Sequence, residues 1–184
     1  MMMLSSTEAV TTAKVNNILT NMRQLKTAAT AWYVDHIDYV YPEADDQIQN
    51  YVMSYTSGGK TETSNAKRIQ NVARNNHSEI TRYLNNGDNI SLNVDDKWGD
   101  NTPRDSYAIM DGDGGIYPKA SRTKWFVAYR VPDDSRIKEK LAGRAKSLGL
   151  IRGWNTTTNK GDIYDGKNNN GKFVYMEILS LKDE

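Results

Sequence analysis

The residues whose type and spacing could do chemistry are aspartates near the middle of the chain. Asp111 and Asp113 lie in the run Asp-Gly-Asp-Gly-Gly at 111–115. Carboxylates two residues apart are typical of calcium loops, since Ca²⁺ takes about 6–8 oxygen ligands. The run lacks the third oxygen ligand and the distal glutamate of an EF-hand. Two interpretations stay open: an improvised calcium site, or an Asp/Gly turn that serves only the backbone.

The sequence gives little support to other chemistry. It contains two histidines, His36 and His77, and no cysteine, which disfavours a zinc site because zinc is held mainly by these residue types. There is no G-x-S-x-G nucleophile motif. The Gly-Lys-Thr at 59–61 lacks the first glycine of a phosphate-binding loop. We therefore expect a protein that is not an enzyme and has no small-molecule substrate, with calcium as the only candidate cofactor.

A long amphipathic helix at 5–37 is the clearest structural prediction. Its apolar or small residues alternate between spacings of three and four, which places them on one helix face: Val15, Ile18, Met22, Leu25, Ala29 and Trp32. Ser5 and Glu8 have the spacing of a capping box at the start. From Ser5 to His36 such a helix is about 48 Å long at a rise of about 1.5 Å per residue. Because that exceeds the width of a small domain, we expect a spine that carries a domain on one side.

The rest of the chain predicts an α+β domain with additional helices. We expect strands at 90–94, 106–110, 125–131 and 173–181, and a hairpin loop at 166–171 that joins the last strand to 162–165. Helices are expected at 43–55, 65–86 and 135–148. The length and the lack of repeats favour a single domain, 1–184, in which the spine (5–37) packs on the antiparallel sheet of a globular head (42–184).

Charged and aromatic residues each leave alternatives open. Residues 35–118 hold 14 acids and 7 bases, whereas residues 119–152 hold 10 bases and 3 acids. The basic stretch is a solvated helix face, a contact between acidic and basic faces of neighbouring subunits, or a nucleic-acid surface. Five aromatic residues are expected in or near loops, where they seal the sheet or form a recognition surface: Trp98, Tyr107, Tyr117, Trp154 and Tyr164.

Residues 9–42 resemble the exposed half of the N-terminal helix of type IV pilins and type II secretion pseudopilins. The matching residues are Ala13-Lys14-Val15-Asn16, the stretch from Met22 to Ala28, Trp32-Tyr33, Asp35 and the turn Tyr41-Pro42. The sequence departs from the family at Asp38-Tyr39-Val40, where an Asn-Gly turn is more usual. It also lacks the prepilin leader and the apolar stretch that follows that leader. The resemblance covers about a fifth of the chain.

This resemblance implies a structural subunit of a type IV pilus or a type II secretion pseudopilus. It implies an extracytoplasmic protein of the periplasm or cell surface, anchored in the inner membrane before assembly by an apolar half-helix absent from this sequence. Other pilin-like subunits would be its partners, and DNA where the filament serves DNA uptake. Some pseudopilins bind calcium near a D-x-W-G stretch, so Asp96 in Asp96-Lys97-Trp98-Gly99 joins Asp111 and Asp113 as a candidate ligand. The alternative function is an extracellular adhesin-type module that binds a carbohydrate or a surface.

Overall fold

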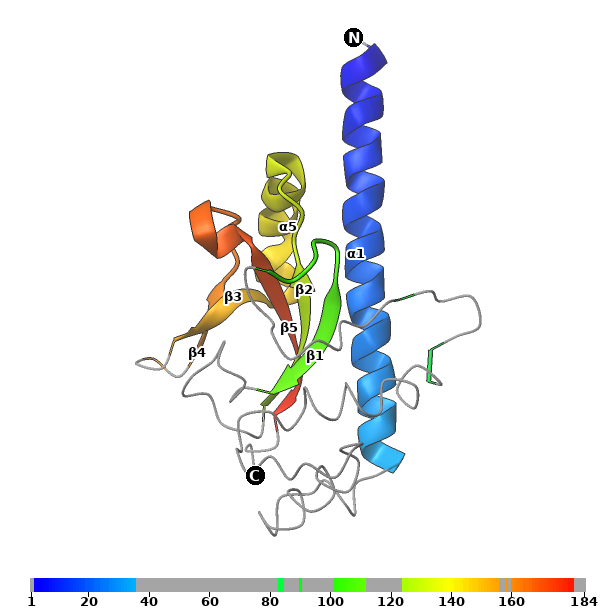
Figure 1. The fold of residues 1–184 in the computed structure, drawn as a ribbon, viewed down its shortest axis with the longest axis vertical. Coiled ribbons are helices and arrows are strands. Elements are labelled where there is room, and N and C mark those ends of the chain that lie inside the picture. The colour runs from blue at the N-terminus through cyan, green and yellow to red at the C-terminus, as the bar shows by residue number, and fades with distance from the viewer. Residues whose placement is uncertain are drawn as a thin grey trace.

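A long helix stands beside an antiparallel sheet in the computed structural model, which describes residues 2–35, 83–84, 90, 101–111, 124–155, 158 and 160–180 (Figure 1). The described elements are α1 (Met2–Asp35), β1 (Tyr107–Asp111), β2 (Lys124–Arg130), α5 (Ser135–Leu148), β3 (Leu150–Asn155), β4 (Lys160–Ile163), the 3₁₀ helix η2 (Asn168–Gly171) and β5 (Phe173–Ser180). Their strands form one sheet in the order β1-β2-β5-β3-β4, with every neighbouring pair antiparallel. An α+β fold with an N-terminal helix packed on an antiparallel sheet is thus confirmed.

The helix α1 forms where the apolar spacing predicts it, but its start differs. It already begins at Met2, so Ser5 lies inside the helix and is not its N-cap. Methionine and leucine are good helix formers, and the run Met2-Met3-Leu4 therefore gives no reason for the helix to stop before Ser5. The described helix ends at Asp35. The last two residues of the predicted range, 36–37, lie outside the described residues.

The central strands β2 and β5 are buried on both faces of the sheet. Val127, Tyr129 and Val174 face the side on which α1 lies, and they belong to the same apolar cluster as the helix residues. Phe126, Ala128 and Tyr175 form a second cluster on the opposite face, as the alternation of side chains along a strand requires. Burial on both faces explains why β2 is a nearly continuous apolar and aromatic run.

The helix α5 has the predicted bounds because both of its ends carry local stop signals. The Asp134 side chain accepts a hydrogen bond from the Arg136 backbone N–H at 2.9 Å, which satisfies one of the free donors of the first turn. Gly149 follows the last turn with φ of 66°, a left-handed conformation that favours glycine. Ile137, Leu141 and Ala145 are buried along one face, which turns α5 toward α1 and the sheet.

The remaining elements differ from the predictions in several places. The segment before 166–171 does not form a hairpin with β5, because β4 pairs with β3 and β5 lies between β2 and β3. The strand β3 was not predicted, since Arg152 and Gly153 interrupt its apolar residues. Near the end of the predicted helix at 65–86, Tyr83 and Leu84 form a turn and a bend, and the rest of that range lies outside the described residues. Ile90, the first residue of the predicted strand at 90–94, is not in a strand. The predicted helix at 43–55 and residues 91–94 lie outside the described residues.

Candidate functional site: the contact between the spine helix and the head

The six predicted stripe residues come together in one buried contact, called here the spine contact. Each of them is 0–2% exposed: Val15, Ile18, Met22, Leu25, Ala29 and Trp32. They share an apolar cluster with residues of β1, β2, β5 and α5. Leu19 and Ala28 are buried beside them and widen the stripe. The spine contact therefore fixes α1 along the face of the sheet over about half of its length.

A polar network that the sequence did not predict joins α1 to the sheet edge. The Asn21 amide donates a hydrogen bond to the Tyr107 hydroxyl at 3.1 Å. The ring of Tyr107 contacts that of Tyr129, with centroids 4.8 Å apart, and the Tyr129 hydroxyl donates to Asp105 Oδ1 at 2.6 Å. Asp105 has a φ of 64°, which is uncommon for a residue other than glycine. Only the sheet register, which the sequence does not reveal, brings these residues together.

Burial of the two tyrosines changes their acidity. Burial raises the pKa of Tyr107 to about 12, and the nearby Asp105 charge adds to this rise, whereas the hydrogen bond from Asn21 opposes it. Burial also raises the pKa of Tyr129, and the hydrogen bond and charge of Asp105 raise it further. Both hydroxyls therefore stay protonated through the neutral range and act here as hydrogen-bonding groups.

Alkaline pH is expected to destabilise the protein through these tyrosines. An unfolded tyrosine ionises near pH 10, whereas folded Tyr107 ionises near 12. Between these values the unfolded chain has lost a proton that the folded chain keeps, so the free energy of unfolding falls as pH rises through this window. Denaturant melts at a series of alkaline pH values measure the free energy of unfolding, and phenolate absorbance measures the ionisation of the tyrosines. In Tyr107→Phe the free energy of unfolding should fall less steeply with pH. Equal slopes of this free energy against pH in the wild type and the variant would contradict the assignment of the decline to Tyr107.

The basic residues of α5 are largely matched by groups of the same chain. Arg144 donates to the Asn16 side chain at 2.7 Å, and Lys140 lies 3.6 Å from Glu8, so both connect α5 to α1. Lys138 contacts Asp133 at 3.7 Å. These contacts favour the interpretation of the basic stretch as a solvated helix face, in which Lys140 and Arg144 also contact the spine helix. Their exposure means that each contributes only about 0–1 kcal/mol to stability.

The N-terminal part of α1 extends past the sheet (Figure 1). Its side chains from Thr7 to Val10 are exposed, and Val10 is 67% exposed. The same helix thus has one segment enclosed by its own domain and another whose side chains are exposed, where Glu8 makes the contact with Lys140 of α5. Within the described residues, no helix combines the length and the apolar character needed to cross a membrane.

The candidate calcium ligands are not brought together by the described part of the chain. Asp111 is the last residue of β1, where it pairs with Trp125 of β2. Asp96 and Asp113 lie outside the described residues. Among the residues that are described, no group of three or more histidine, cysteine, aspartate and glutamate side chains could hold a metal ion. The calcium prediction stays a prediction.

Two of the five aromatic residues expected near loops are not surface groups. Tyr107 lies in β1 and is 5% exposed, and Tyr164 is 1% exposed. The Tyr164 hydroxyl donates to the Gly171 carbonyl at 2.9 Å, so it ties the end of β4 to η2. Trp154 lies in β3, and Trp98 and Tyr117 lie outside the described residues. Tyr107 and Tyr164 therefore pack inside the protein and cannot form a recognition surface.

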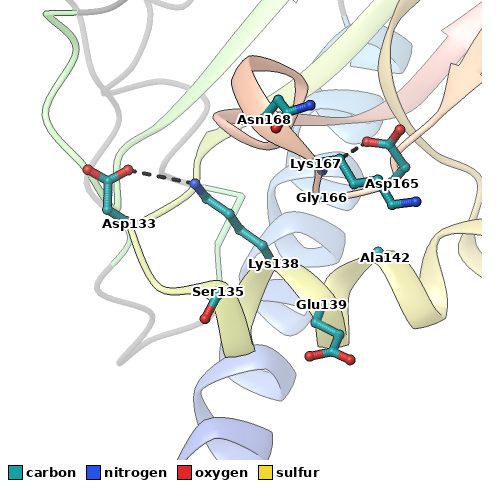
Figure 2. A pocket seen from close by; sticks show the side chains of 9 residues that line it. All are labelled: Asp133, Ser135, Lys138, Glu139, Ala142, Asp165, Gly166, Lys167 and Asn168. Atoms are coloured by element: carbon teal, nitrogen blue, oxygen red, sulfur yellow. Dashed lines mark hydrogen bonds and ion pairs between the residues drawn. The ribbon is translucent and has the colours of Figure 1, made fainter.

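A cleft of about 590 Å³ lies between the first turns of α5 and the segment 165–168 (Figure 2). Its charged lining residues carry both signs: Asp133, Glu139, Asp165, Lys138 and Lys167. Figure 2 shows Lys138 directed toward Asp133, and the Lys167 backbone N–H donates to Asp165 at 3.0 Å. None of the described lining residues is aromatic, so the cleft has no ring on which a sugar could stack.

Comparison with known proteins finds no counterpart for the chain. No protein-family model, no curated protein and no solved structure matches it. The function is therefore inferred from the spine contact, the exposed end of α1 and the sequence pattern of that helix.

Proposed function

We propose that this chain is a structural subunit of a type IV pilus or a type II secretion pseudopilus, with a pilin-like fold. The observation that carries the proposal is the division of α1 between a buried and an exposed segment. Its stripe from Val15 to Trp32 is enclosed by the head, whereas the side chains from Thr7 to Val10 are exposed. A helix that one domain covers only in part is suited to contact with neighbouring copies. The resemblance of residues 9–42 to pilins supports the same function.

In this proposal the mechanism is assembly. Each subunit uses the exposed segment of α1 to contact a different surface of the next subunit, and such heterologous contacts build an open helical filament. The spine contact and the Asn21–Tyr107 hydrogen bond hold the head at a fixed position on the helix. An apolar segment preceding this chain would anchor the subunit in the inner membrane before assembly and then lie in the filament core. The head then works outside the cytoplasm.

The remaining parts of the proposal concern ligands. The protein acts as a structural subunit and performs no catalysis, and its partners are other pilin-like subunits. DNA is a partner only if the filament belongs to a DNA-uptake system. Calcium held by Asp96, Asp111 and Asp113 would stabilise the head, so a thermal melt with and without Ca²⁺ tests that part separately.

Photo-crosslinking in cells that make the natural gene product tests the assembly proposal. A photo-reactive residue at Val10, which is 67% exposed on α1, is expected to give a ladder of multimers of this chain. The matched control places the same residue at Ile163, which is 52% exposed on β4 at the sheet edge. That position should give fewer multimers. A Val10 variant that yields only monomer, or crosslinks only to unrelated proteins, would contradict the proposal.

A further inference from the structure

Arg130 carries a charge that the protein buries without a counter-charge. It is the last residue of β2, and 5% of it is exposed. Its Nη1 donates to the Lys172 carbonyl at 3.2 Å, and its guanidinium lies 4.7 Å from the centroid of the Phe173 ring. A carbonyl and a ring face compensate a cation only in part, because they carry no net charge. A buried charge of this kind is costly unless something pairs with it.

The unused part of this guanidinium is the edge that recognises oxyanions. Of the buried side-chain nitrogen and oxygen atoms of the described residues, Nε of Arg130 is the one without a hydrogen-bond partner. Among the described residues, no acceptor is described for Nη2 either. Nε–H and Nη2–H point the same way and form the fork that binds two oxygens of a carboxylate or phosphate. The Nη1 contact holds the plane of the fork in place.

The aspartate nearest in the fold does not serve as the counter-ion. The backbone N–H of Asp105 donates to the Arg130 carbonyl at 2.8 Å, but its carboxylate accepts the Tyr129 hydroxyl. Tyr129 belongs to the cluster on the α1 side of the sheet. Because neighbouring residues of a strand point to opposite faces, the Arg130 side chain lies on the other side. The described ion pairs leave Arg130 uncompensated.

We propose that Arg130 is an oxyanion-binding site, which takes a carboxylate or a phosphate-type anion on its Nε–Nη2 edge. The anion supplies the missing negative charge and two acceptors at once. It binds the folded chain only, because Nη1, Phe173 and the backbone fix the guanidinium there. This site is independent of the proposed assembly function and lies on the face of the sheet opposite α1.

Thermal melts in inorganic phosphate or acetate, with chloride replaced at constant ionic strength, test the proposal. The melting temperature of the wild-type chain should rise by about 3–6 °C when the anion reaches roughly ten times its Kd, and it should continue to rise with the logarithm of the anion concentration. Arg130→Met should lack this rise, and in chloride it should melt no lower than the wild type, since the unpaired buried charge is gone. Arg130→Lys keeps the charge without the fork and should lose most of the response. The control Arg144→Met, an exposed change on α5, should respond like the wild type.

A rise with acetate alone that Arg130→Met lacks would assign a carboxylate ligand, and such a rise with phosphate would assign a tetrahedral anion. Equal responses in wild type and Arg130→Met would overturn the proposal. If Arg130→Met does not fold, calorimetric titration of the wild-type chain with each anion decides the matter. The proposal then requires saturable binding that Arg130→Lys weakens, and it is wrong if neither anion binds.

Discussion

Trp32→Ala is expected to lower the free energy of unfolding by about 3–5 kcal/mol. Trp32 is fully buried at the end of the spine contact and is among the largest side chains enclosed by the head. Its removal takes apolar area out of the core and leaves a cavity that the fixed helix and sheet cannot close. For a chain of this length the melting temperature should fall by about 6–20 °C. Thermal and urea melts of the purified chain measure the change.

The matched control is Val34→Ala in the same helix. Val34 is 58% exposed, so its truncation should change the free energy of unfolding by less than about 0.5 kcal/mol. Both substitutions shorten an apolar side chain of α1, but Trp32 is fully buried and loses a larger group, whereas Val34 is exposed. Similar small effects for Trp32→Ala and Val34→Ala would mean that the helix does not pack on the sheet as described.

Gly166→Ala is expected to have the second largest effect, a loss of about 2–4 kcal/mol. Gly166 has a φ of 69°, which L-amino acids with a side chain rarely adopt. An added Cβ would also lie 2.7 Å from the backbone oxygen of Lys138 in α5. A backbone atom inside a helix cannot rotate away as a side chain can, so the segment 165–168 would have to separate from α5. The cleft of Figure 2 would then change shape.

Gly149→Ala separates the cost of the positive φ from the cost of the close contact with the Lys138 backbone. Gly149 has nearly the same φ, 66°, but an added Cβ would meet nothing within 4 Å. Its substitution therefore carries the conformational cost alone, about 1 kcal/mol. Urea melts of the two variants give the difference that belongs to the contact with Lys138. Equal losses of unfolding free energy in Gly166→Ala and Gly149→Ala would show that segment 165–168 does not closely approach α5.

The elements that the sequence predicted are those whose signals are local. Three- and four-residue spacing identifies the buried face of α1 because a single helix face fulfils the pattern without help from the rest of the chain. The bounds of α5 follow from Asp134 and Gly149, which act within one turn of the helix. The strand β2 was predicted because its aromatic and β-branched residues suit a doubly buried strand.

The errors concern pairings between distant segments. Residues 162–165 and 173–181 are close in sequence and separated by a turn, so a hairpin was the simplest prediction. The sheet instead places β5 between β2 and β3, an arrangement that depends on long-range contacts. The Asn21–Tyr107 hydrogen bond and the unpaired edge of Arg130 are likewise products of sheet register. In the sequence, Asn21 is one polar residue among several on α1, and Arg130 is one base in a basic stretch.

The most direct test of the assembly account is electron cryo-microscopy of filaments sheared from cells that make the natural gene product. The account predicts filaments built from this chain. In them, Thr7 to Val10 of α1 contact neighbouring subunits while Trp32 stays enclosed by the head of its own subunit. Filaments that lack this chain, or a filament map in which Thr7 to Val10 face solvent, would contradict the account.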